Sequence, residues 1–220
     1  MSPRPFERPA TIVLPESEAP TPGASLDGLW LPARGEDGAR GGAVVAPPHP
    51  LMGGSMGSPV STEVAIAASD VGFASLRFDW RGVGGSAGTP SGEVADADRD
   101  YRAALDFMQE SVEGPIVACG YSWGALAALR VGAASPRTRR LVLVAPPAAM
   151  IDADLLASFG RPVLVVAGDR DEYVPVDPLH ELLDPLEAAE LVVLEGVDHF
   201  FMAGLGDLGR CVREWLDRGR

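Results

Sequence analysis

Ile116-Val-Ala-Cys-Gly-Tyr-Ser-Trp-Gly124 joins an apolar run of strand length to a Gly-x-Ser-x-Gly pentapeptide. Gly120 and Gly124 suit a sharp turn, because residues without a Cβ atom let a strand and a helix pass close to each other. Ser122, at the centre of such a turn, takes a strained backbone conformation and projects its hydroxyl clear of the sheet. The stretch predicts a strand, a tight turn and a helix, with Ser122 as a candidate nucleophile.

Short apolar runs alternate with segments of helical spacing on both sides of this stretch, from about residue 43 onward. The runs are apolar throughout, which favours strands covered on both faces and hence a parallel sheet. The expected strands are 43–46, 74–78, 116–119, 141–145, 162–167 and 190–194. The expected helices are 59–71, 93–112, 123–134, 178–186 and 205–218. This alternation predicts an α/β fold with a doubly wound, mostly parallel sheet flanked by helices.

Two further strands, at 11–14 and 26–31, are expected to extend one edge of the sheet as an antiparallel hairpin. Late in the chain, only residues 146–161 separate two expected strands, enough for one short helix at about 151–159. A cap domain needs more chain than this. We therefore expect a single domain, 1–220, whose ligand site lies open at the carboxyl ends of the strands.

Composition excludes some classes of partner. The formal net charge is −13 and the basic residues are scattered, so neither a nucleic acid nor an anionic membrane surface is an expected partner. The first nine residues carry no apolar leader, and no stretch approaches the ~18 apolar residues of a spanning helix. Cys119 and Cys211 suit reduced packing residues better than a disulfide. We expect a cytoplasmic protein, either a monomer or a homodimer.

A serine nucleophile needs a general base, and the chain has three histidines. His199 follows the last expected strand and so lies at the carboxyl edge, where Ser122 should also stand. His180 falls within a helical segment and is expected on the surface. His49 ends an earlier strand and is expected to shape its loop rather than to carry a proton. The candidate base is therefore His199.

A histidine base needs a carboxylate that holds its tautomer. Two candidates, Asp169 and Asp171, lie in the loop after the penultimate strand. Asp171 is two positions further from the strand and can reach across to the His199 loop, whereas Asp169 is close enough to bond local backbone amides. Both aspartates would also suit a turn with no chemical role. The order Ser122, Asp171, His199 is favoured.

A tetrahedral intermediate needs two preorganised N–H donors for its oxyanion. One candidate is the backbone N–H of Trp123, the residue after the serine. The other is expected in the loop 47–54, after the strand that ends at residue 46. Pro50 has no N–H, so Leu51 is favoured and Met52 is the alternative. The same loop could also be a proline- and glycine-rich turn without a functional amide.

Other motifs fit poorly. Residues 82–87 contain Gly-x-Gly-x-x-Ala, but residues 88–92 separate these glycines from the next helix, so they cannot place a pyrophosphate at its N-terminus. Asp169-x-Asp171 lacks the glycine and distal glutamate of a calcium loop. We expect no cofactor and no metal.

With these residues in hand, the chain resembles the α/β-hydrolase superfamily over nearly its whole length. More narrowly, it resembles small, lidless bacterial hydrolases described as predicted carboxylesterases. The matching stretches are 49–56, 76–86, 120–124 and 198–201. The resemblance implies a triad of Ser122, Asp171 and His199, no cofactor, and ester hydrolysis through an acyl-enzyme.

The leading hypothesis is a serine esterase that acts on small or short-acyl esters through an acyl-enzyme on Ser122. Thioesterase, lactonase, amidase and peptidase activities use the same machinery and stay open. A different class of protein, a catalytically silent module that binds a ligand in the same pocket, is the less favoured alternative because Ser122, Asp171 and His199 are all present.

Overall fold

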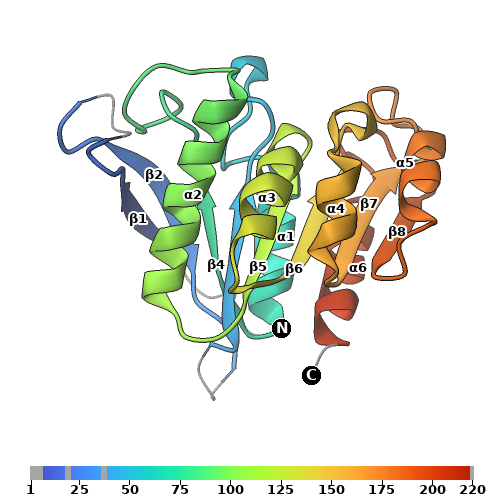
Figure 1. Ribbon diagram of the computed structural model, residues 1–220. Coiled ribbons are helices and arrows are strands. Elements are labelled where there is room, and N and C mark those ends of the chain that lie inside the picture. The colour runs from blue at the N-terminus through green and yellow to red at the C-terminus, as the bar shows by residue number, and fades with distance from the viewer. Residues whose placement is uncertain (1–6, 18–20, 36–38, 219–220) are drawn as a thin grey trace.

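A computed structural model describes residues 7–17, 21–35 and 39–218 (Figure 1). Its centre is an eight-stranded sheet in the order β1-β2-β4-β3-β5-β6-β7-β8. The strands are β1 (Arg8–Val13), β2 (Ser25–Leu31), β3 (Gly41–Ala46), β4 (Phe73–Phe78), β5 (Ile116–Tyr121), β6 (Thr138–Val144), β7 (Val163–Gly168) and β8 (Ala189–Leu194). All pairings from β4 to β8 are parallel. The predicted α/β class and mostly parallel sheet are confirmed.

The central strands are covered on both faces. Every residue of β3, β4, β5 and β7 is buried, as their unbroken apolar runs predict. β8 is the edge strand and is only half-buried throughout. The N-terminal hairpin also forms as expected, with β1 antiparallel to β2 and β2 antiparallel to β4.

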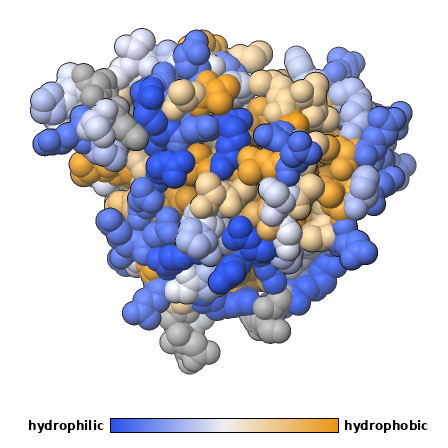
Figure 2. All heavy atoms as spheres, viewed as in Figure 1, coloured by the Kyte–Doolittle hydropathy of each residue, from blue (hydrophilic) through white to orange (hydrophobic). Residues whose placement is uncertain are grey.

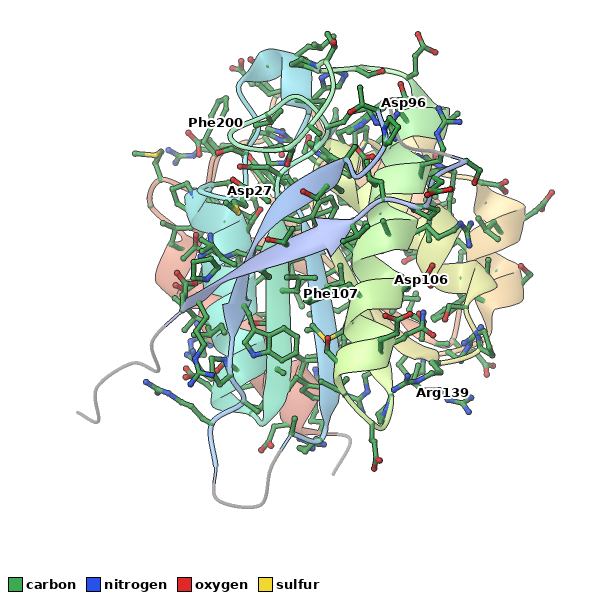
Figure 3. All side chains as sticks on the ribbon, turned by 90° about the vertical axis from the view of Figure 1, so that its left-hand side faces the viewer. Asp27, Asp96, Asp106, Phe107, Arg139 and Phe200 are labelled. Atoms are coloured by element: carbon green, nitrogen blue, oxygen red, sulfur yellow. The ribbon has the colours of Figure 1, made fainter. Side chains whose placement is uncertain are left out.

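Helices cover both faces of the sheet. The view in Figure 3 looks along the sheet with β1 and β2 in front, α1 and α6 on one side and α2 on the other. Contacts between α1 and α6, and from α2 through α3 to α4, define these two layers. The helices are α1 (Pro59–Asp70), α2 (Val94–Ser111), α3 (Trp123–Ala134), α4 (Ala153–Phe159), α5 (Val176–Leu183) and α6 (Leu205–Asp217).

Short connections leave the carboxyl edge of the sheet uncovered by a cap domain. Helix α4 and the 3₁₀ turn η2 (Ala148–Met150) take up the connection between β6 and β7, as the spacing predicts. A second 3₁₀ turn, η1 (Pro50–Met52), follows β3 at the upper edge in Figure 1. The chain moves from β3 to β4 on one side and returns to β5 on the other, so the topological switch point of this doubly wound sheet lies between β3 and β5.

Both cysteines are free. Cys119 is buried in β5, and Cys211 is half-buried in α6, where burial raises the pKa of its thiol to about 11. These positions confirm the expectation of reduced packing residues.

Within the described part of the chain, no helix is long and apolar enough to cross a bilayer. The expectation of no apolar leader concerns the first nine residues, and residues 1–6 among them lie outside the described residues.

Candidate active site

Ser122 occupies a strained turn between β5 and α3. Its backbone has φ 53° and ψ −118°, in a region that residues with a Cβ atom rarely adopt. A Cβ atom on Gly120 would lie 2.2 Å from the carbonyl oxygen of Gly124, and one on Gly124 would lie 2.4 Å from that of Pro47. The two glycines are therefore required by close packing of backbone against backbone, as the pentapeptide predicts.

Three side chains from separate loops meet at this turn. The Nε2 atom of His199 lies 3.1 Å from the hydroxyl oxygen of Ser122. The Nδ1 atom of the same ring lies 2.6 Å from Oδ2 of Asp171. Hydrogen-bond distance on both sides of the imidazole is the arrangement in which a histidine takes a proton from serine and a carboxylate fixes its tautomer.

Asp171 is held so that one carboxylate oxygen faces His199. Its other oxygen, Oδ1, accepts hydrogen bonds from the N–H groups of Tyr173 at 2.9 Å and Val174 at 2.8 Å. The alternative carboxylate, Asp169, instead accepts a hydrogen bond at 2.6 Å from the N–H of Gly196. The structure thus brings Asp171 to the imidazole and leaves Asp169 bonded to local backbone.

The loop that carries His199 is tied to the strand that carries Ser122. The hydroxyl of Tyr121, the last residue of β5, donates a hydrogen bond to the carbonyl oxygen of His199 at 2.8 Å. Burial raises the pKa of the Tyr121 phenol, and the Asp171 and Asp198 carboxylates raise it further. Tyr121 is therefore a neutral donor at physiological pH. Sequence reasoning missed this contact, although Tyr121 stands inside the Gly-x-Ser-x-Gly motif.

The other two histidines lie where the sequence places them. His180 is half-exposed on α5, with its Nδ1 atom 3.8 Å from a carboxylate oxygen of Asp184. The His49 ring packs against the Trp123 ring with centroids 4.7 Å apart. Its Nδ1 atom accepts a hydrogen bond from the N–H of Leu51 at 3.2 Å and so caps η1. Partial burial lowers the pKa of His49, which favours the neutral ring that can accept this bond.

The expected oxyanion donors differ in their present partners. Trp123 is the first residue of α3, where a helix has no acceptor of its own for the N–H group. The Leu51 N–H points to His49, and the Met52 N–H donates to the His49 carbonyl oxygen at 3.1 Å. A substrate that recruits Leu51 must therefore replace the bond to His49.

Buried polar contacts hold the loop after β3 against the loop after β4. The indole N–H of Trp80 donates to the carbonyl oxygen of Pro48 at 2.9 Å. The next residue, Arg81, forms an ion pair at 2.7 Å with Asp100, whose side chain is 1% exposed. Burial raises the pKa of Asp100, and hydrogen bonds from Arg81 oppose that shift. This network anchors the backbone from which η1 begins.

Among the described residues, no group of three or more His, Cys, Asp or Glu side chains is placed to hold a metal ion.

Comparisons with known proteins bear on the family and the fold of the chain. A family model described as "Serine aminopeptidase, S33" matches residues 53–159, a range that includes Ser122 but ends before Asp171 and His199. An uncharacterized protein of Rickettsia prowazekii is 30% identical over 189 residues, which cover 79% of this chain and 77% of that protein.

Two solved structures cover nearly the whole chain. An α/β serine hydrolase homologue from Coxiella burnetii has a TM-score of 0.79 and 28% identity, over 94% of this chain and 97% of that one. A lidless α/β serine hydrolase from Xanthomonas campestris has a TM-score of 0.79 and 29% identity, over 99% and 97%. The fold and the site define a hydrolase-type protein. The chain belongs to the α/β-hydrolase superfamily, and the part of it that the structure describes contains no cap domain.

Proposed function

We propose that the protein is a serine carboxylic ester hydrolase that acts on small or short-acyl esters through an acyl-enzyme on Ser122. The observation that carries the proposal is the unbroken hydrogen-bonded series from the Ser122 hydroxyl through His199 to the Asp171 carboxylate, on a strained strand-to-helix turn. Lidless hydrolase relatives support the same class of chemistry.

In the acylation half of the proposed reaction, His199 Nε2 takes the proton of the Ser122 hydroxyl as Oγ attacks the ester carbonyl carbon. The carbonyl π electrons move to oxygen, and the N–H groups of Trp123 and Leu51 stabilise the resulting oxyanion. The intermediate collapses when the bond to the leaving oxygen breaks, and the imidazolium gives its proton to that oxygen. Asp171 stabilises the imidazolium without becoming protonated.

In the deacylation half, His199 takes a proton from a water molecule, whose oxygen attacks the acyl carbon of the acyl-enzyme. Collapse of this second intermediate returns the proton to Ser122 and releases the carboxylic acid. No other reagent is needed, so the chain's own residues supply every proton transfer. The uncapped site favours short acyl chains and predicts no rate increase above the micellar threshold of a long-chain substrate.

The test compares wild type with Ser122→Ala on p-nitrophenyl acetate and butyrate, together with labelling by a fluorophosphonate probe. The expected result is hydrolysis and stoichiometric labelling of wild type, and loss of both in the variant. Equal activity of the two proteins, or a wild type that the probe does not label, would overturn the proposal.

The same machinery admits a thioester, lactone or amide as substrate. Matched acetyl thioester, lactone and anilide substrates distinguish these activities when kcat/KM is measured for each. The silent-module alternative predicts ligand binding without a burst of product and without probe labelling. Light scattering measures whether the protein is a monomer or a homodimer.

A further inference from the structure

Exposed apolar side chains gather at the carboxyl edge of the sheet. Within the described residues, six of the eight exposed large hydrophobic side chains lie on loops that follow parallel strands. These six are Leu51, Met52, Met150, Tyr173, Phe200 and Met202. Figure 2 shows apolar groups interrupting the hydrophilic surface toward the upper right of the same view as Figure 1. Apolar groups that stay exposed around a catalytic edge mark a binding surface.

Two of the six, Tyr173 and Phe200, flank His199. Their ring centroids lie 5.1 Å and 5.7 Å from that of the imidazole, and 6.1 Å from each other in an edge-to-face arrangement. The two residues remain 65% and 56% exposed. Figure 3 places Phe200 at the upper end of the molecule. The pair thus offers apolar surface to a ligand beside the base.

Backbone hydrogen bonds hold the main chain from which both rings extend. The N–H of Tyr173 donates to Asp171 at 2.9 Å, and the N–H of Phe200 donates to Asp198 at 3.2 Å. Glu172, next to Tyr173, and Asp198, two positions before Phe200, are exposed carboxylates in a chain of formal net charge −13. Such a surface suits a neutral apolar group and disfavours an anion.

Acyl-transfer chemistry determines which part of a substrate meets this surface. The carbonyl oxygen faces the backbone N–H groups, whereas the leaving oxygen must lie near His199 Nε2 to receive its proton. The substituent on the leaving oxygen therefore extends past the imidazole toward the two rings. We infer that Tyr173 and Phe200 form the binding site for the leaving alcohol, and that this alcohol is neutral and aromatic. The inference rests on the proposed ester hydrolysis and names its alcohol.

Acetate esters with different alcohols test this site, because they all form the same acyl-enzyme and share one deacylation step. The substrates are phenyl acetate, 4-carboxyphenyl acetate and ethyl acetate, assayed with wild type, Tyr173→Ala and Phe200→Ala. The matched control is Val13→Ala, which truncates an apolar side chain that is 68% exposed on β1. Intrinsic differences in ester reactivity cancel in the ratio of variant to wild type.

Each ring truncation is expected to lower kcat/KM for phenyl acetate about tenfold, the size of a lost aromatic contact of about 1.4 kcal/mol. The same variants should change kcat/KM for ethyl acetate less than twofold and leave the deacylation rate unchanged. Wild type should favour phenyl over 4-carboxyphenyl acetate, although the second has the better leaving group. Val13→Ala should match wild type on every substrate.

Equal losses on phenyl and ethyl acetate would overturn the alcohol site, as would no loss on either or a preference for the carboxylated ester. A loss of kcat/KM that disappears when the protein is diluted would assign the rings to an interface between two copies, and this result would also overturn the alcohol site. These results leave ester hydrolysis intact, since the fluorophosphonate probe still labels Ser122. A wild type that is neither labelled nor active on any ester would overturn the proposed function and the alcohol site together.

Discussion

The two flanks of Ser122 are organised differently. On the acid–base flank, the contacts from serine to histidine to aspartate are already formed, and both oxygens of the buried Asp171 have partners. On the oxyanion flank, the Leu51 N–H is exposed and bonded within its own loop to His49.

This difference follows from what each flank must do. A buried charge has to be fully hydrogen bonded in the resting protein, because an unpaired carboxylate in a low-dielectric site is costly. A neutral N–H group can keep a weak partner and exchange it for a developing oxyanion, which is a stronger acceptor. In the proposed reaction the acid–base flank is thus set before substrate arrives, whereas the substrate completes the oxyanion flank.

The largest effect is expected from Asp171→Asn. An amide that keeps its oxygen toward the N–H groups of Tyr173 and Val174 turns its NH2 group to His199 and donates a hydrogen bond to Nδ1. Nε2 then carries the ring proton and cannot accept the serine proton. We expect kcat for p-nitrophenyl acetate to fall by about 10³–10⁴. Asp169→Asn is the control, because the amide oxygen can still accept the hydrogen bond from the Gly196 N–H. This variant should lower kcat less than tenfold. Similar losses in both variants would contradict a prearranged acid–base flank centred on Asp171.

The next effect is expected from Gly124→Ala, which reaches the oxyanion flank through the backbone. The added Cβ would lie 2.4 Å from the Pro47 carbonyl oxygen and 2.7 Å from that of Ala46. Displacing this backbone should cost about 1–3 kcal/mol of unfolding free energy in urea and about 100-fold in kcat. In Gly206→Ala the new Cβ has no heavy atom within 4 Å beyond its chain neighbours and its own helix backbone, so the free energy of unfolding should hold or rise. Wild-type stability and activity in Gly124→Ala would refute the close approach.

A smaller effect is expected from Tyr121→Phe, which removes the hydroxyl that holds the His199 carbonyl. Leaving that buried carbonyl without its donor should cost about 1–3 kcal/mol in urea unfolding. We expect kcat to fall about tenfold as the imidazole loses its fixed position, with KM nearly constant. Tyr173→Phe removes an exposed hydroxyl and should change stability by no more than about 0.5 kcal/mol. If both variants behave alike, the His199 loop does not depend on Tyr121.

The smallest effect is a pH dependence on the oxyanion flank. Because burial lowers the pKa of His49 from its ordinary value of 6.5, the unfolded chain binds a proton there before the folded protein does. The contribution of His49 to the free energy of unfolding is complete above pH 6.5 and is lost as the pH falls below that value. His49→Asn keeps an acceptor for the Leu51 N–H but does not titrate. Urea unfolding at pH 7.5 and 5.5 should show wild type losing stability relative to this variant; parallel curves would contradict the assignment.

Much of the fold was predictable because it depends on neighbours in the sequence. Unbroken apolar runs predict buried parallel strands. The two glycines around Ser122 predict a tight turn, and the backbone contacts there leave no room for a Cβ atom at either position. The chain order of serine, aspartate and histidine followed from strand ends that share one edge of a parallel sheet. The observed ends of helices and strands differ from the predicted ends by a few residues; β5, for example, was expected to end at residue 119 and continues to Tyr121.

The pairing of side chains across loops could not be predicted in the same way. Asp169 and Asp171 are two residues apart in one loop, and only the packed positions of the β7 and β8 loops send one to Gly196 and the other to His199. The bonds from Leu51 to His49 and from Tyr121 to the His199 carbonyl, and the rings beside the imidazole, likewise depend on how loops meet. Local sequence specifies strands, turns and residue types, whereas a distance of 2.8 Å between two residues of this site that are 78 positions apart is set by packing of the whole chain.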